Sequence, residues 1–398
     1  MEKLKVGILG LQRGLTHLHN FLAVEEALVI GAADRRESFR ERAKPYIEDR
    51  ETRLVAEFEE LLEMQPDAVV VATNGKLQTN HAIQALEAGC HVLSEVPGAY
   101  TEEECVRLRD AVLRTGKTYM LGENACYWDF LRHFRKWVTE GRLGHVSAAE
   151  AEYLHYLPHT LENEDGKRLM PSEARAQGRT DVPPTWRADQ PPIQYLTHDL
   201  GPLLEVLDDR VVSVTCLSAP WQCTEAPLRS DAQFALYRTA RGVVLRVMVT
   251  LNTRRPSEHR YRLFGTEGAA EWFMYEGFAR LFDRAREEHE GWEARPVGLA
   301  ALDQDTSTGH GGADLKMAQH FARAILDGRP APIDLFRMID YTLPGIIANR
   351  SAELGGIPLA IPELRTEPFP GTRFWETVGL PSIEAEGVKY NSGALSEE

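Results

Sequence analysis

The sequence has 398 residues, which is long for a single hydrophobic core and predicts two domains. Its composition, with 43% hydrophobic, 26% charged and 8% aromatic residues, is that of a globular protein. The 45 Lys and Arg residues against 60 Asp and Glu residues give a net charge of −15, which disfavours a partner bound through its phosphate backbone, so no nucleic-acid ligand is expected.

The first part of the chain alternates short apolar runs with helical periodicity, which is typical of a doubly wound parallel sheet in an α/β fold. Strands are expected at Leu4–Leu9, Leu28–Ala33, Ala68–Ala72, His91–Ser94 and Tyr119–Leu121, and helices at Phe39–Ile47, Phe58–Met64, His81–Ala88 and Glu102–Thr115. Residues Thr101–Glu104 have the form of a capping box, which places the start of the last of these helices. We expect this first domain to span residues 1–122.

From about residue 146 longer strands follow one another with few helices between them. They are expected at Val146–Tyr156, Val211–Ser218, Ala232–Tyr237, Val243–Leu251 and Tyr261–Gly265. This pattern predicts a second, α+β domain over residues 123–382 with a mostly antiparallel sheet, and a loosely ordered tail at residues 383–398. A helix is expected at Gly309–Leu326, and the long polar segment Pro158–Pro192 is expected to border a binding site.

Several features exclude other classes of protein. No apolar run approaches the roughly 18 residues of a membrane span, and MEKLKVGILG enters a strand without the regions of an export signal. The five cysteines form no CxxC pair, which favours free thiols and a cytoplasmic protein. The pairs His17-x-His19 and His155-x3-His159 lack the companions of a metal site, so no metal is expected.

The turn after the first strand resembles a dinucleotide-binding fingerprint only in part. Gly10 occupies its first glycine position, but Gln12 and Leu15 occupy the second and third. Asp34, at the end of the second strand, is placed to accept hydrogen bonds from the ribose hydroxyls of NAD.

Other residues near that sheet edge bear on the cofactor. Arg35 and Arg36 follow Asp34, and they leave NADP open because a guanidinium can bind a 2′-phosphate. Thr73 and Asn74 end the third predicted strand at the same edge. The sequence therefore favours NAD and does not exclude NADP.

Residues 67–105, DAVVVATNGKLQTNHAIQALEAGCHVLSEVPGAYTEEEC, resemble the Gfo/Idh/MocA oxidoreductases. The resemblance implies a Rossmann domain, a second domain with a large open sheet whose face often mediates homo-oligomer formation, and a nicotinamide between the domains. Carried over by position, the cofactor contacts would be Gly10, Gln12, Arg13, Asp34, Arg35, Thr73, Asn74, Glu95, Val96, Glu123 and Asn124.

Two proton-handling groups of the family dehydrogenases are missing. Their EKP lysine is Val96 here, and the histidine of their D-x-G-x-H motif is Leu203, whereas the aspartate remains as Asp199. The same losses mark a subgroup, the NAD-dependent glycosidases that resemble α-N-acetylgalactosaminidases. The sequence is similar to this subgroup in Glu95–Pro97, Glu123–Tyr127, Tyr153–His155, Tyr195–Pro202 and His310–Asp314.

This similarity implies a redox cycle on a sugar or glycoside. A hydride leaves a ring carbon, a base removes the neighbouring proton, the leaving group departs, water adds and the hydride returns. Histidine and a perturbed tyrosine can supply bases tuned near neutrality, so His198 and Tyr153 are expected as the acid/base pair. The other expected site residues are Tyr195, His155 and Asp199 in the catalytic site, Glu123 at the nicotinamide or ribose, and Trp186 and Arg187 as sugar platform and clamp.

Two alternatives remain open from the sequence. One is a sugar or polyol dehydrogenase with net hydride transfer, in which Asp199 and His198 replace the missing lysine. The other is a sensor that keeps the Rossmann domain without catalysis, which the incomplete glycine fingerprint favours.

Overall fold

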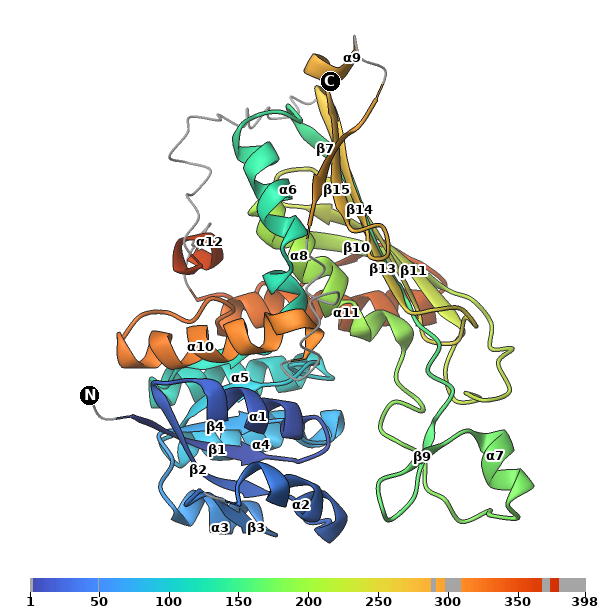
Figure 1. The fold of residues 1–398 in the computed structure, drawn as a ribbon. Helices are drawn as coiled ribbons and strands as arrows, with labels where there is room; N and C mark the ends of the chain where they lie inside the picture. The colour runs from blue at the N-terminus through green and yellow to red at the C-terminus, as the bar shows by residue number, and fades with distance from the viewer. Residues whose placement is uncertain (1–2, 49, 288–290, 298–308, 367–372, 379–398) are drawn as a thin grey trace.

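The computed structural model describes residues 3–48, 50–287, 291–297, 309–366 and 373–378, and it contains two large sheets. In Figure 1 the N-terminal sheet lies below and the larger, C-terminal sheet stands beside and above it. Helices α10 (Ala313–Leu326) and α11 (Leu335–Glu353) lie between the two sheets. The predicted tail, residues 383–398, lies outside the described residues.

The N-terminal sheet has six parallel strands in the order β3-β2-β1-β4-β5-β6. Its strands are β1 Leu4–Leu9, β2 Ala27–Ala33, β3 Arg53–Val55, β4 Ala68–Val71, β5 His91–Ser94 and β6 Tyr119–Leu121. The order reverses beside β1, and in such sheets ligands bind where the carboxyl ends of the strands face this reversal. The doubly wound parallel sheet that the sequence predicted is confirmed. Strand β3 was not predicted because Arg-Leu-Val is too short to show a pattern.

The helices of this domain are α1 Gly14–Ala23, α2 Glu37–Ala43, α3 Phe58–Glu63, α4 Gly75–Glu87 and α5 Glu102–Thr115, with a 3-10 turn η1 at Lys44–Tyr46. Helix α4 begins six residues before the predicted His81, because the side chain of Asn74 accepts a hydrogen bond from Lys76 N at 3.0 Å and caps the helix there. Thr101 caps α5 through Glu104 N at 3.1 Å. The reciprocal bond of a capping box is absent, since the Glu104 carboxylate accepts from Tyr100 N instead.

The second sheet has nine strands in the order β16-β15-β14-β13-β7-β12-β11-β10-β17. They are β7 Val146–Leu154, β10 Val211–Ser218, β11 Ala232–Thr239, β12 Val244–Thr250, β13 Glu258–Gly265, β14 Gly268–Phe273, β15 Phe278–Asp283, β16 Glu293–Pro296 and β17 Leu359–Ala360. All neighbouring pairs are antiparallel except β7 with β12, so the predicted sheet type is confirmed.

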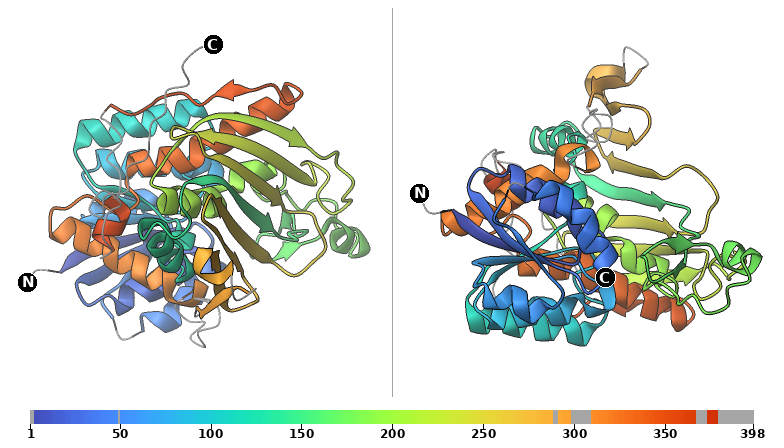
Figure 2. Two further views of the ribbon diagram at one scale, coloured as in Figure 1. Left: turned by 90° about the horizontal axis from the view of Figure 1, so that it is seen from above. Right: turned by 60° about the horizontal axis from the view of Figure 1, so that its bottom comes forward.

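Helices cover one face of this sheet, as the two views of Figure 2 show. They are α6 Phe130–Thr139, α8 Thr197–Leu207 and α11. Alternate residues of the strands point to the other face, where Leu217, Phe234 and Leu236 are exposed. One face of the sheet is therefore open and partly apolar, as the resemblance implied.

Two segments of the second half of the chain return to the N-terminal domain. Helix α10 packs on α1, where the rings of Phe21 and Phe321 meet edge to face. The segment Pro158–Pro192 contains β8 Leu161–Glu162, β9 Arg168–Leu169 and α7 Pro171–Ala176, and it extends beside α2 in Figure 1. The 3-10 helices η2 Asn124–Tyr127, η3 Pro192–Tyr195 and η5 His310–Gly312 contain residues of the site described below. The short helix α9 Arg284–Glu287 lies at the top of the second sheet in Figure 1, whereas α12 Arg373–Thr377 places the buried Phe374 and Trp375 in the hydrophobic core.

Two expectations from the sequence, one about membrane spans and one about the cysteines, concern residues that the structure describes. None of the helices described is long and apolar enough to cross a membrane. All five cysteines lie in the described part of the chain and are free thiols, as predicted.

Candidate functional site

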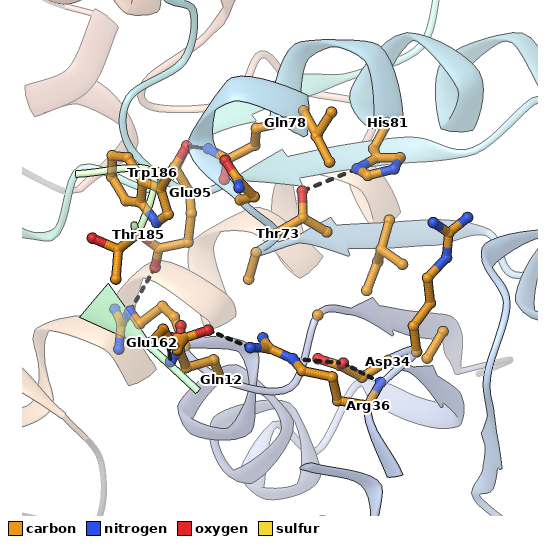
Figure 3. Close-up of a pocket in the computed structure, with 18 of the residues that line it drawn as sticks. Gln12, Asp34, Arg36, Thr73, Gln78, His81, Glu95, Glu162, Thr185 and Trp186 are labelled. Atoms are coloured by element: carbon orange, nitrogen blue, oxygen red, sulfur yellow. Dashed lines mark hydrogen bonds and ion pairs between the residues drawn. The ribbon is translucent and has the colours of Figure 1, made fainter. Parts of the chain in front are cut away.

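A cavity of about 520 Å³ opens at the carboxyl ends of the N-terminal strands. Its walls come from the turns after β1, β2, β4 and β5 and from the Pro158–Pro192 segment (Figure 3). The predicted residues that line it are Gly10, Gln12, Arg13, Asp34, Arg35, Thr73, Asn74, Glu95, Val96, Trp186 and Arg187. The position of the cavity is thus the one that strand order and strand ends predicted.

The turn after β1 allows a close approach of the backbone. Gly10 has φ +86°, and a Cβ there would lie 2.6 Å from the carbonyl oxygen of Ala72, so only glycine fits. Gly14, one residue before the third fingerprint position, begins α1, and a Cβ there would lie 3.2 Å from the Ile8 side chain. The two glycines therefore perform the tight-turn and helix-packing functions of the fingerprint although the spacing differs.

Asp34 is fixed at the end of β2. Its carboxylate accepts hydrogen bonds from Leu11 N at 2.8 Å and from Arg36 N at 2.9 Å, and it lies on the cavity wall. This buried acceptor beside an open glycine turn fits the ribose of a dinucleotide. The donor set and the turn geometry are therefore those that an NAD-type cofactor requires.

A network of charged side chains holds the loop after β5. Glu95 accepts hydrogen bonds from Arg13 Nε at 2.8 Å and His17 Nε2 at 2.6 Å. Burial alone would raise the pKa of Glu95, but the Arg13 charge and the His17 hydrogen bond outweigh it and bring the pKa to about 2. Glu95 is therefore an anion that anchors Arg13, and Val96 beside it forms an apolar part of the wall.

Arg13 also reaches α10. Its Nη1 donates to Asp314 Oδ2 at 2.8 Å, and Asn124 Nδ2 donates to Asp314 Oδ1 at 3.0 Å and lies 2.9 Å from His310 Nδ1. Asn124, predicted to contact the dinucleotide, does not line the cavity, because its amide is directed to Asp314 and His310. Sequence analysis assigned no role to Asp314, although His310–Asp314 was among the segments that carried the resemblance.

An aromatic and imidazole cluster of the second domain lies beside the cavity. Tyr153 and the residue after the end of β7, His155, stack with ring centroids 3.9 Å apart, as alternation along a strand predicted. The Tyr153 ring is also 5.7 Å from His198 and 5.3 Å from Tyr195. The structure thus brings together four of the predicted catalytic residues.

His198, at the start of α8, pairs with a buried carboxylate. Its Nδ1 lies 2.7 Å from Glu123 Oε1, which also accepts from Ala125 N at 3.1 Å. Tyr261 donates its hydroxyl proton to the backbone carbonyl of His198 at 2.5 Å. Glu123 was expected at the nicotinamide or ribose, but its side chain is completely buried behind His198 and does not line the cavity. Its contacts fit the orientation of an imidazole rather than cofactor binding.

The ionisation of the neighbouring groups corrects one prediction. Burial raises the pKa of Tyr153 well above its ordinary value, so the phenol is not tuned near neutrality and stays protonated. Burial lowers the pKa of His155 to about 2, which leaves its ring neutral. Tyr153 therefore keeps its phenolic proton, and the His198 imidazole is hydrogen-bonded to a carboxylate, an arrangement typical of an imidazole base.

Asp199 lies on the far side of this cluster. It is fully buried, its Oδ1 is 3.3 Å from His259 Nδ1, and burial raises its pKa well above the ordinary range. Burial also lowers the pKa of His259 to about 3. Like Tyr153 and His198, Asp199 is not among the residues that line the cavity. The ring of His259, a residue that was not predicted from the sequence, contacts Asp199 and has its centroid 4.8 Å from that of the Tyr153 ring.

Arg187 connects the cavity with the cluster. It lines the cavity, donates from Nη2 to the Tyr195 hydroxyl at 2.6 Å, and its guanidinium lies 4.7 Å from the Trp186 ring centroid. The buried Arg229 donates to the carbonyl oxygen of Arg187 at 2.8 Å and holds this part of the segment in place. A cation and an aromatic surface are thereby fixed where the cavity meets the cluster.

Another missed residue is Gln78, on the first turns of α4. Its side-chain amide donates to the carbonyl oxygens of Glu95 and Pro97, the latter at 3.1 Å, and so tethers the loop after β5. A glutamine on a helix has no pattern that would have identified this function.

Comparison with known proteins agrees with the fold and the cavity. Residues 4–123 match the family described as oxidoreductase family, NAD-binding Rossmann fold. The N-terminal domain, which provides much of the cavity wall, is thus similar to NAD-binding Rossmann domains. Over residues 4–123 the chain resembles the Gfo/Idh/MocA oxidoreductases.

Two curated relatives match most of the chain. It is 25% identical over 390 residues to glycosyl hydrolase family 109 protein 1 of Shewanella sp. (strain MR-4), covering 88% of this chain and 83% of that protein. It is 24% identical over 390 residues to the α-N-acetylgalactosaminidase of Shewanella oneidensis, with the same two coverages of 88% and 83%. The resemblance noted in the sequence therefore extends well beyond the Rossmann domain.

Solved structures share the fold. Levoglucosan dehydrogenase in complex with NADH and L-sorbose has a TM-score of 0.75 at 19% identity, covering 92% of this chain and 100% of that chain. An oxidoreductase domain protein from Kribbella flavida has a TM-score of 0.74 at 20% identity, covering 91% and 100%. The two-domain architecture of the present chain is that of these proteins.

Proposed function

We propose that this protein is an NAD-dependent, sugar-processing enzyme, and specifically a glycosidase that recycles NAD within each turnover. The observation that carries the proposal is the Glu123–His198 pair with Tyr153, beside a cavity suited to a dinucleotide and without the family lysine. The names of the curated relatives, glycosyl hydrolase family 109 protein and α-N-acetylgalactosaminidase, support the same activity.

The residues that would hold the cofactor are those of the cavity. Asp34 would accept from a ribose hydroxyl, the Gly10 turn would admit the pyrophosphate, and the wall at Val96 would face the nicotinamide. When bound, NAD would take up a hydride from a sugar ring carbon and return it at the end of the turnover.

The proton transfers fall to the second domain. Because Nδ1 of His198 faces Glu123, its Nε2 is the nitrogen that can take the proton from the ring carbon next to the newly formed carbonyl. The buried, protonated Tyr153 would donate a proton to the departing glycosidic oxygen. Water would then add across the resulting double bond and replace the departed group. After the hydride has returned, the sugar would be released with its oxidation state unchanged.

Arg187 and Trp186 would position the sugar. The guanidinium is held by Tyr195 and lies over aromatic rings, so its remaining donors can bind sugar hydroxyls. Trp186 packs over Gly75 and offers an apolar ring face, which suits the C–H face of a sugar.

A second candidate function is a sugar or polyol dehydrogenase with net hydride transfer. Asp199 favours it, since this residue keeps the aspartate of the dehydrogenase motif, and the neighbouring His259 offers a route for a proton. We rank it second because the names of the curated relatives favour a glycosidase.

One pair of assays separates the candidates. Purified protein is supplied with NAD and a free sugar, and NADH is followed by absorbance; in parallel, nitrophenyl α- and β-glycosides are tested for cleavage. Glycoside cleavage without net NADH supports the proposal, whereas stoichiometric NADH formation from the sugar overturns it. Absence of any bound or binding dinucleotide by native mass spectrometry would instead support a non-catalytic sensor.

We also propose a cytoplasmic homo-oligomer. The open face of the second sheet, with Leu217, Phe234 and Leu236 exposed, is an apolar surface that association of two copies would cover. Sedimentation of the wild type and of Leu236→Glu tests this, and a monomeric wild type would contradict it.

A further inference from the structure

A hairpin of the second domain closes over the adenosine end of the cavity. It consists of β8, β9 and the turn between them, and it contacts α2 of the N-terminal domain (Figure 1). Ser38 Oγ and Arg42 Nη2 donate to the carbonyl oxygen of Asp165 at 3.4 and 3.3 Å. Gly166 packs so closely on the Phe39 ring that a Cβ there would overlap it. The hairpin is therefore docked against the helix that follows Asp34.

Glu162, at the end of β8, is the centre of this contact. Its carboxylate accepts from Gln12 Nε2 at 2.7 Å, forms an ion pair with Arg36, and lies 3.3 Å from Arg168 Nε (Figure 3). Arg168 Nη2 donates in turn to Gln12 Oε1 at 2.9 Å. The nearby Gln12 and Arg36 lower the pKa of Glu162 despite its burial, so the residue is an anion in this wall.

Both arginines that could bind a 2′-phosphate are already paired with carboxylates. Arg36 lies between Glu162 and Asp34, with its Nε 3.6 Å from Asp34 Oδ1, and its guanidinium stacks on Phe39 at 4.0 Å. Arg35 is largely exposed and pairs with Glu57 at 2.9 Å. A 2′-phosphate would therefore meet two carboxylates and a cation that is already neutralised, whereas a neutral 2′-hydroxyl can donate to Asp34.

We infer that Glu162 is a specificity-determining residue that makes the site select NAD over NADP by holding Arg36. The inference rests on the proposed function, because it assumes that a dinucleotide occupies this cavity. Glu162 belongs to the second domain, so this domain contributes to the selection of NAD over NADP together with Asp34 of the first domain. To bind Arg36, a phosphate would have to displace Glu162, which would leave that half-buried carboxylate with only Gln12 and Arg168 as partners.

The test compares Glu162→Gln with a matched control. Glu164→Gln removes the same charge from the same hairpin and the same cavity wall, and Glu164 forms no ion pair with any residue that the structure describes. Full-length wild type and variants are equilibrated with equimolar NAD and NADP, freed of unbound nucleotide, denatured, and the released nucleotides are quantified by chromatography. Circular dichroism and melting curves check that each variant is folded.

The wild type should release mainly NAD. In Glu162→Gln the ratio of NAD to NADP should fall about tenfold, since a charge-assisted hydrogen bond to a freed guanidinium is worth at least this factor. Glu164→Gln should keep the wild-type ratio, and Arg36→Ala added to Glu162→Gln should restore it. Such a return to the wild-type ratio in the double variant would show that the increased NADP binding of Glu162→Gln depends on Arg36.

Four results would overturn the inference. A ratio that is unchanged in folded Glu162→Gln, or that changes equally in Glu164→Gln, would show that Glu162 does not act through Arg36. A wild type that prefers NADP would contradict it directly. A wild type that binds neither nucleotide would refute the proposed function as well, and this outcome is distinct from the first two because it appears before any substitution is made.

Discussion

Substitution of Glu123 by glutamine tests the carboxylate–imidazole pair on which the proposed mechanism depends. Glutamine has nearly the same shape, so its Oε1 can still accept from His198 Nδ1, 2.7 Å away, and from Ala125 N, 3.1 Å away. The imidazole tautomer and orientation are therefore kept. What is lost is the negative charge that stabilises the imidazolium formed when His198 takes up a proton.

The size of the effect follows from the difference between a hydrogen bond to a charged group and one to a neutral group. A hydrogen bond to a charged group contributes about 1.5–3 kcal/mol and a neutral one about 0.5–1.5 kcal/mol, so the change costs about 1–1.5 kcal/mol of transition-state stabilisation. This corresponds to a fall in kcat/KM of about tenfold. His198→Asn removes the base altogether and should cost about 10²–10⁴-fold.

The assay is the release of nitrophenolate from the nitrophenyl glycoside that the wild type cleaves, beginning with the N-acetyl-α-galactosaminide, followed across the pH range. His133→Asn is the control, because this histidine lies on α6 with its ring 5.8 Å from the Trp137 ring, outside the cluster. Glu123→Gln with wild-type kcat/KM would refute the reasoning. So would a loss in His198→Asn no larger than that in the control.

Three further predictions concern the cavity. Gly10→Ala should abolish NAD binding measured by calorimetry, because the added Cβ would lie 2.6 Å from the Ala72 carbonyl oxygen; unimpaired binding would contradict the turn geometry. Glu95, whose pKa falls from 4.5 to about 2, should stabilise the fold above about pH 4.5 and lose this contribution as the pH falls toward 2. The melting temperatures of wild type and Glu95→Gln should therefore converge on acidification, and a constant difference would exclude the pairing with Arg13. Arg187→Lys should raise KM about tenfold with a smaller change in kcat, since lysine cannot keep the guanidinium's fixed set of donors; unchanged kinetics would exclude it from the sugar site.

The fold was predictable from sequence because its signals are local. Buried parallel strands appear as continuous apolar runs, and the change to longer strands after about residue 146 marks the second sheet. The errors lie where local signals compete. Charged Glu258 and Arg260 hide the start of β13, so the predicted strand began at Tyr261 and His259 was assigned to no element.

The site was predictable only in part, and for a related reason. Residues at strand ends line the cavity, so their chain positions sufficed to place Gly10 and Asp34 there. Asp314 meets Arg13 only because α10 returns to α1, a contact that depends on the tertiary structure. Glu162 lies in a polar segment with no periodicity, and nothing in its neighbourhood in the sequence connects it with Arg36.

The loss of the family lysine acquires a physical meaning when Val96 and Arg187 are considered together. Val96 is 6% exposed and presents an aliphatic surface to the cavity at the position of that lysine. The same cavity receives a guanidinium from the Pro158–Pro192 segment, fixed by Tyr195 and by the contact of its backbone with Arg229. A lysine amine can exchange protons near neutrality, whereas a guanidinium cannot, so this cation can bind and orient but cannot act as a base. In the proposed mechanism, proton transfer is therefore left to His198 and Tyr153, and the choice of reaction would depend on the second domain rather than on the strand-end signature of the first.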